Sequence, residues 1–443
     1  MSCRLGRLLC LALLFVSSGP LWAQGNYEVD LSAIEQEIAR TVTKPYSLGG
    51  FVAVTPTVFG LDRDAALYRL RFFNHDVSNP LTQYDLGLRP EASYRQGIVS
   101  LFARADILGR HTSQGWEANA RLFEGFISLK PSPSLALDAG KKVVKWGKGY
   151  AWSPVAFVDR PKNPEDPEEA LEGFYLVHAN LIRSFAGPVK TLAFTPVLLP
   201  VFAGVNDDFG LTEHVNVAAK LYCLCFDTDL DVMVFTGGSR TTRYGVDFAK
   251  NLLTNLEIHG EWAFLTGIDT PLITPRGERS SRTADVMSAL VGLRYLTPQD
   301  LNVILEYYYN GTGFTRQELH DFFAFVDSSD ATFVRTGNAS GLQRAATLAE
   351  GAYGRPNPMQ HYVYVRASQK EPWNIVYFTP ALTTLVNVVD HSFVLIPELL
   401  YSPRTNLELR LRGAVFVGGH GTEYGEKQND YRLELRVRYY WQS

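Results

Sequence analysis

Cysteine is scarce in this sequence, and beyond the N-terminal segment only Cys223 and Cys225 remain. On a β-strand, residues two apart share a face and their side chains begin roughly 6 to 7 Å apart. The β-carbons of a disulfide lie about 4 Å apart. These two cysteines are therefore not expected to pair, and disulfides are not expected to hold the protein together.

Long apolar runs and an excess of one charge are missing too. After the N-terminal segment, no stretch reaches the about 18 uninterrupted apolar residues of a transmembrane helix. The 42 basic and 46 acidic residues nearly balance, which argues against a nucleic-acid partner. The nine histidines are scattered, and neither a nucleophile elbow nor a phosphate-binding loop is present. We expect no catalytic residues, no metal site and no cofactor.

The N-terminal segment itself has the pattern of a signal peptide. Arg4 and Arg7 precede an apolar run from Leu8 to Val16, which is too short to span a bilayer. We predict a signal peptide at 1–23, with an uncleaved anchor as the alternative. The mature chain is therefore expected to leave the cytoplasm.

Residues 24–48 are predicted to form an N-terminal periplasmic or plug segment that contains a short helix. Apolar residues recur there at helical spacing, and Ser32 and Glu35 have the spacing of a capping box. The apolar positions are Leu31, Ile34, Ile38 and Val42.

From residue 49 onward the apolar pattern has a period of two, which is typical of β-strands. Between Arg432 and Trp441, three arginines, a glutamate and Tyr440 share one face, and the opposite face is apolar. The same alternation occurs in 66–73, 101–107, 301–310 and 407–415.

The connections between these segments alternate between short and long. This layout predicts an all-β fold: a transmembrane antiparallel up-and-down β-barrel over 49–443, with polar rows facing an aqueous lumen and apolar rows facing lipid. A large secreted β-protein is the alternative. The short connections are 130–134, 297–300, 370–373 and 402–406, and the long ones are 146–170, 268–282, 311–358 and 418–430.

The barrel is expected to have about 16–18 strands, because single-chain bacterial barrels have an even number. We take 66–75 as the first spanning strand. Segment 50–60, which contains Pro56, would then line the interior. Alternatively, one of the later segments is not a strand.

Two stretches resemble bacterial outer-membrane porin-like β-barrels. The C-terminal strand resembles the aromatic-rich closing strand that serves as their assembly signal. In 137–169, a strand ending in GKKVVKWG precedes a loop rich in proline and aspartate, which resembles a motif of uncharacterised porin-like proteins of Gram-negative bacteria. The resemblance implies a location in the outer membrane of a Gram-negative bacterium, in contact with its lipid, and implies no established substrate.

Closure of the barrel would place 66–75 beside 407–417 and 431–441, since the last strand of a barrel pairs with the first. Seven arginines would then face two glutamates, a formal excess of five positive charges on one wall. Guanidinium groups stay charged, so they are tolerated only beside water, anions or acids. The predicted pore-lining residues are Arg69, Arg71, Arg104, Arg410, Arg412, Arg432, Arg436, Arg438, Glu408 and Glu434.

The segment 159–172 can supply acidic partners, and its prolines stiffen it. We expect it to fold into the barrel and form a constriction with a transverse field. A solvated surface loop, with an arginine row paired within itself, is the alternative. The predicted constriction residues are Trp146, Asp159, Glu165, Asp166, Glu168 and Glu169, although a tryptophan such as Trp146 is more often a packing or girdle residue than a ligand contact.

These patterns lead to the hypothesis of a channel for passive diffusion of small solutes. A sheath barrel filled by a partner protein or by its own segments, such as 311–358, is one rival. An outer-membrane hydrolase is another. The three aspartates of 227–231 could bind calcium, but lumen lining fits them better because the glycine and glutamate of an EF-hand are absent. A homo-oligomer or a periplasmic partner is left open.

Overall fold

A computed structural model describes residues 44–113 and 115–443. Residues 46–443 form one compact unit. The predicted signal peptide and the predicted N-terminal helix lie outside the described residues. No helix in the described part of the chain is long and apolar enough to cross a membrane.

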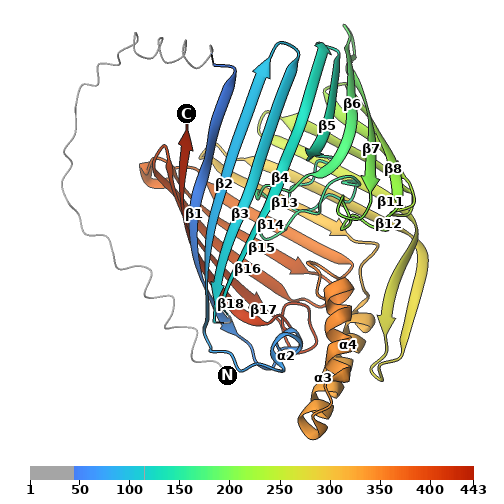
Figure 1. Ribbon diagram of the computed structural model, residues 1–443, viewed down its shortest axis with the longest axis vertical. Coiled ribbons are helices and arrows are strands. Elements are labelled where there is room, and N and C mark those ends of the chain that lie inside the picture. Colours follow the sequence, from blue (N-terminus) through green and yellow to red (C-terminus); the bar gives the residue numbers. More distant parts are fainter. Residues whose placement is uncertain (1–43, 114) are drawn as a thin grey trace, which may run out of the picture. The chain divides into compact units, whose positions relative to one another are not determined.

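The compact unit is a closed antiparallel barrel of 18 strands (Figure 1). Each strand pairs with its neighbours in the sequence, and the first strand also pairs with the last, which closes the sheet. The predicted antiparallel barrel of 16–18 strands is confirmed. The strands are β1 (Tyr46–Leu61), β2 (Leu81–Gln96), β3 (Val99–Thr112), β4 (Gly115–Ser132), β5 (Leu135–Lys142), β6 (Phe174–Ser184), β7 (Val189–Val201), β8 (His214–Cys225), β9 (Thr228–Thr236), β10 (Arg243–Leu253), β11 (Leu256–Ile273), β12 (Arg279–Leu296), β13 (Leu301–Tyr309), β14 (His361–Gln369), β15 (Phe378–Asn387), β16 (Phe393–Arg404), β17 (Leu407–Val417) and β18 (Asn429–Gln442).

The two rims of the barrel differ in their connections. The turn rim carries the start of β1, the end of β18 and mostly short turns. The loop rim, at the bottom of Figure 1, carries the longer connections and helices α2, α3 and α4. The helices are α2 (Ala66–Phe72), α3 (Arg316–Thr336), α4 (Ser340–Leu348) and the π-helix η2 (Ala349–Tyr353), and a 3-10 turn η3 (Pro372–Asn374) lies on the turn rim.

Strand β18 shows how the alternating sequence becomes a two-faced wall. Its arginines and Glu434 face the lumen, where they are partly buried and ion-paired. Its other face is apolar and exposed, and it begins at Tyr431 and ends at Tyr439. Aromatic residues at both ends of an apolar band are typical of a barrel wall that meets lipid.

The prediction of a strand over 66–73 is wrong, because this segment forms helix α2. Ala66 and Leu70, one helical turn apart, are buried against the helices of the loop rim. A segment this short can fit both the helical period of 3.6 residues and the strand period of two, and tertiary packing decides between helix and strand. Arg69 and Arg71 therefore lie on a helix of the loop rim, and Arg69 pairs with Asp327 of α3 at 2.6 Å.

The first strand is instead β1, which contains the segment predicted to line the interior. The ladder from β1 to β18 runs through Val54 and Thr57 but has no paired residues at Thr55 and Pro56. Proline has no N–H to donate, so an interruption on one side of the strand accommodates it.

The predicted long loop 268–282 is also wrong. Strands β11 and β12 continue through it, and their hairpin extends beyond neighbouring strands on the loop rim (Figure 1). The register between β11 and β12 shifts after Leu265, so the outer half of this hairpin pairs in a new register. Polar residues in the extension interrupt the period-two pattern, so the sequence did not predict that the two strands continue there.

The apolar outer face predicts a position-dependent cost for charge. Leu435, at the middle of β18, is exposed and borders an outer groove with Leu399 and Leu411. Leu435→Arg should lower the free energy of unfolding by about 2–4 kcal/mol, the cost of a guanidinium near the bilayer midplane. Urea unfolding in lipid vesicles measures this. Leu400→Arg, at a position that lines an internal cavity, should cost much less, and equal costs would contradict the assignment of the faces.

Candidate functional site in the barrel lumen

The connection between β5 and β6, residues 143–173, folds into the barrel, and we call it the lumen loop. Its own Asp159 holds the first part of the loop. The carboxylate accepts backbone N–H bonds from Val144 and Trp146 at 2.8 Å each and from Lys145 at 3.2 Å. These bonds satisfy amides that no strand pairing reaches.

Two carboxylates on the barrel wall hold the middle of the lumen loop. Glu261 of β11 accepts N–H bonds from Lys148 and Gly149 at 2.6 Å each. Glu306 of β13 accepts bonds from the amides of Tyr150 and Ala151. Both carboxylates are buried, so each needs such donors to remain inside the protein.

Gly149 allows this close approach to the wall. A β-carbon there would lie 2.2 Å from the carbonyl oxygen of Trp152 and 2.9 Å from Leu290. Any larger residue would push the loop away from Glu261.

Apolar packing fixes the same loop against the wall. Trp146, Val155 and Phe157 are buried with lumen-facing residues of β6 to β9 and β11. Trp152 stacks on Tyr308 with ring centroids 5.2 Å apart. Burial of each such side chain contributes about 1.5–3 kcal/mol. Trp146 therefore packs the base of the lumen loop.

The acidic end of the lumen loop reaches the opposite wall. We call Arg410 and Arg412 of β17, with the arginines of β18 at 432, 436 and 438, the arginine wall. Asp166 accepts bonds from Arg410 and Arg412 at 2.8 Å each, and Glu165 pairs with Arg432 at 2.7 Å. Burial alone would raise the pKa of Asp166, but the two guanidinium groups lower it to about 2.

The arginine wall is neutralised rather than positive, which corrects the predicted excess of five. Arg436 pairs with Glu408 at 2.9 Å. Glu398 of β16 pairs with Arg412 at 2.8 Å. Glu434 pairs with Arg410 at 3.1 Å. The excess disappears because α2 removes two arginines and because β16 and the lumen loop add three acids.

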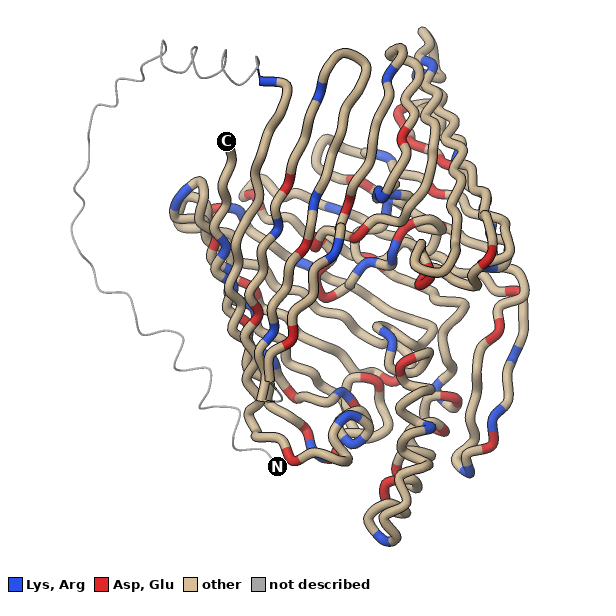
Figure 2. The backbone as a smooth tube through the Cα atoms, viewed as in Figure 1, with Lys and Arg blue, Asp and Glu red and all other residues tan. Residues whose placement is uncertain are grey.

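A second set of charges lines β2 to β4. Arg104 pairs with Glu91 at 2.7 Å and with Glu124 at 2.9 Å, and Arg89 pairs with Asp106 at 3.0 Å. Figure 2 shows this interleaving of acidic and basic positions along the strands. Local pairing of this kind lets charged rows line an enclosed wall.

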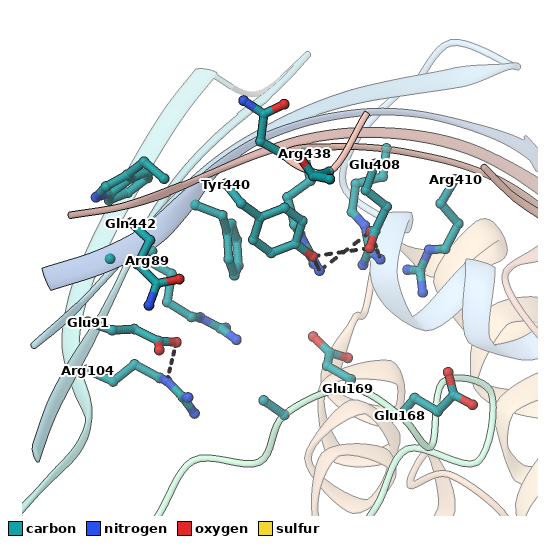
Figure 3. A pocket seen from close by; sticks show the side chains of 18 of the residues that line it. Arg89, Glu91, Arg104, Glu168, Glu169, Glu408, Arg410, Arg438, Tyr440 and Gln442 are labelled. Atoms are coloured by element: carbon teal, nitrogen blue, oxygen red, sulfur yellow. Dashed lines mark hydrogen bonds and ion pairs between the residues drawn. The ribbon is translucent and has the colours of Figure 1, made fainter. Parts of the chain in front are cut away.

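An internal cavity of about 820 Å³ lies between these walls and the lumen loop (Figure 3). Five arginines and six acidic residues line it, so its formal charge is one negative. In Figure 3, Glu168 and Glu169 rise from the loop into the cavity. Glu168 accepts a bond from Tyr150, whereas Glu169 forms no ion pair with any residue that the structure describes. Enclosure and the charge of Asp166 raise the pKa of Glu169.

The described residues contain no group of three or more ligands that could hold a metal ion. Asp231, within the segment considered for calcium, faces Lys148 at 2.9 Å and Lys220 at 3.7 Å. It is an ion-paired lining residue. Cys223 and Cys225 are free, as expected.

The structure brings together most of the residues that the sequence suggested. It joins Asp166 and Glu165 to three arginines of the arginine wall. Of the other predicted residues, Arg104 pairs within β2 to β4, Trp146 and Asp159 hold the first part of the lumen loop, and Arg69 and Arg71 lie on α2. Sequence reasoning missed Glu261 and Glu398, although each is a lone acid at a lumen-facing position of a mainly apolar strand segment. Such isolated acids are the signal that could have revealed them.

A closed antiparallel barrel with an apolar outside, a charged lumen and a loop folded into that lumen is the porin type of outer-membrane barrel. That is the class of protein that the fold defines.

Comparisons with known proteins agree on the fold. The structure of Pseudomonas aeruginosa OccK5 (OpdH) matches with a TM-score of 0.52 at 13% identity, over 90% of this chain and 98% of that one. Pseudomonas aeruginosa OpdQ matches with a TM-score of 0.52 at 12% identity, over 90% and 99%. OccK11 (OpdR) of the same organism gives 0.50 at 12% identity, over 90% and 96%. No family model and no curated protein matches the sequence.

The anchoring role of Glu261 can be tested by removing its carboxylate. Glu261→Ala should weaken docking of the lumen loop by about 2–4 kcal/mol, because bonds to a charged acceptor contribute about 1.5–3 kcal/mol each. Hydrogen exchange at the amides of Lys148 and Gly149 should accelerate accordingly. Glu257→Ala, on the same strand near the turn rim, serves as the control. Unchanged exchange in Glu261→Ala would show that packing alone holds the loop.

The connection 418–428 on the loop rim also contains a buried carboxylate, Glu423. Glu423, in the connection 418–428, accepts bonds from Tyr362 at 2.6 Å and Asn387 at 2.8 Å, and its other oxygen has no partner. The adjacent Tyr424 accepts a bond from Asn357, which in turn accepts one from Trp152 of the lumen loop. Burial raises the pKa of Glu423 to about 7, although Lys427 and the two hydrogen bonds oppose the shift.

This shift predicts that docking of 418–428 weakens with rising pH. The protonated carboxyl is favoured in the docked loop, so the stabilisation is complete below a pH of about 4.5 and is lost as the pH rises through about 7. The stabilisation of the docked connection that is lost over this pH range amounts to about 3 kcal/mol. Hydrogen exchange in 418–428 should therefore be faster at high than at low pH, after correction for intrinsic rates. Glu423→Gln should abolish this dependence, and Glu350→Gln, an exposed position, should retain it.

Proposed function

We propose that this protein is a channel of the Gram-negative outer membrane through which small solutes diffuse passively. The observation that carries the proposal is the cavity of about 820 Å³ between the lumen loop and the charged walls, inside a barrel of 18 strands. Barrels of 16–18 strands are the size that leaves an aqueous channel. Residues 1–23 would direct export, and 24–45, which precede β1, would form the periplasmic segment.

The solute path is proposed to follow only part of the lumen. An apolar cluster joins α3, α4, η2 and the lumen loop to lumen-facing residues such as Tyr362, Leu385 and Ile396. This cluster fills the side formed by β12 to β17 on the loop rim. The cavity instead borders β1 to β3 and β16 to β18, so solutes would pass along these strands.

The charged residues around the cavity, from the arginine wall and from the end of the lumen loop, would act together as a charge filter. Acids of the lumen loop face guanidinium groups of the arginine wall across the cavity (Figure 3). Because the arginines are paired with acids, the charges free to act on a solute are Glu168 and Glu169. A transverse field of this kind would orient a dipolar solute and discriminate by charge and size.

A sheath barrel filled by its own segments is the second candidate. The burial of the lumen loop inside the wall, and the packing of α3 and α4 over the loop-rim end of the lumen, favour it. Conductance of the purified full-length chain in planar bilayers separates the two. Discrete conductance steps support the channel, whereas their absence with a correctly folded barrel supports the sheath.

Reversal potentials test the charge filter. Glu169→Gln should lower the cation-to-anion permeability ratio by on the order of two- to fivefold, because it removes the free negative charge beside the path. Arg436→Glu should raise the ratio, since it removes one of the two arginines that pair with Glu408 and adds a second acid. Glu350→Gln, at an exposed position on the loop rim, is the matched control. Unchanged ratios in both lumen variants would contradict the charge filter while leaving the conductance itself unaffected.

A further inference from the structure

A group of arginines on the loop rim differs from the arginine wall because it lacks enough acids. Arg160 of the lumen loop, Arg240 of the connection 237–242 and Arg243 at the start of β10 lie on the same side of the barrel. Arg160 takes Asp208 as its ion-pair partner and also lies 3.8 Å from Glu172. Glu172 is already shared with Arg121 and Lys141. Arg240 and Arg243 have no carboxylate partner among the residues that the structure describes.

Aromatic rings hold these guanidinium groups in place. Arg240 lies over the ring of Phe209 at 3.7 Å and donates to the carbonyl oxygen of the same residue at 2.5 Å. Phe209 packs edge-on against Phe174, and Arg160 lies 4.4 Å above the ring of Phe174. Contact with ring faces stabilises a cation but does not neutralise it.

Arg243 lies next to this aromatic group, and its side chain has no polar partner in the part of the chain that the structure describes. In the ladder between β9 and β10 it lies opposite Phe235, a buried residue that packs against Phe209. Among the described residues, neither its buried Nε nor the buried hydroxyl of Thr241, two positions earlier, has a hydrogen-bond partner. Buried donors are normally paired, so these two groups point to an absent acceptor.

The charges of the group repel one another. Burial, followed by the charges of Arg243 and Arg160, lowers the pKa of Arg240 to about 9, and Asp208 offsets this only in part. A guanidinium site that is this poor in acids is stabilised by a bound anion. The planar donors of arginine suit the two oxygens of a carboxylate or phosphate group.

We propose that Arg240 and Arg243, with the hydroxyl of Thr241, bind a small oxyanion, either a carboxylate or a phosphate group, at the loop rim. The site is separate from the arginine wall, whose guanidinium groups are occupied by acids. It adds to the proposed channel a place where an anionic solute or headgroup is held at the mouth of the barrel.

The test measures binding of inorganic phosphate and of acetate to the purified full-length protein by isothermal titration calorimetry. We expect saturable binding of one anion per chain, weakened at least about tenfold, or about 1.4 kcal/mol, in the double variant Arg240→Gln/Arg243→Gln. Arg276→Gln removes one exposed charge in the 274–278 turn of the same rim and should bind as the wild type does. Tighter binding of phosphate than of acetate would assign the site to phosphate groups, and the reverse to carboxylates.

Two outcomes would overturn the site: no saturable binding of either anion by the wild type, or equal binding by wild type and double variant. Arg243→Gln alone guards against misfolding of the double variant, because Arg243 makes no internal polar bond that its loss would break. It should weaken binding several-fold while the barrel keeps its heat-modifiable migration in gels. Conductance in potassium chloride, without phosphate, should be retained by these variants, so a failed channel and a failed anion site give different results.

Discussion

The interior of this barrel depends on carboxylates that accept backbone N–H bonds. A loop without regular structure can enter a barrel only if its amides find acceptors there, because an unpaired buried amide costs about 1–3 kcal/mol. Asp159, Glu261 and Glu306 provide these acceptors for residues 144 to 146 and 148 to 151. The position of the lumen loop, and with it the shape of the cavity, follows from these three side chains.

In the lumen, acidic side chains are also paired with arginines as a general rule. The lumen loop crosses from Glu261 and Glu306 on one side to the arginine wall on the other, where Asp166 bridges Arg410 and Arg412. Each arginine of that wall has an acidic partner, so the wall helps to hold the lumen loop. The group around Arg240 and Arg243 departs from the rule, and this difference separates the paired wall from the proposed anion site.

The sequence predicted the barrel because its signal is local and repeated. Many strands, such as β3, β17 and β18, repeat the alternation of lumen-facing polar and lipid-facing apolar residues, so errors in single segments leave the architecture unchanged. Where the local signal was short or ambiguous, the prediction was wrong. ALYRLRF became helix α2 because its burial depends on α3 and α4. The 268–282 segment became strand because its partner continued beside it.

By itself, the sequence determined the closed barrel, the two faces of its wall and the acidic character of 159–172. Tertiary structure alone decided which acid meets which arginine. Glu398, Glu261 and Glu306 are distant from the lumen loop in sequence, and their roles arise only when closure of the barrel brings the strands around it. A pairing between charges depends on distances across the lumen, and the period of a strand carries no information about those distances.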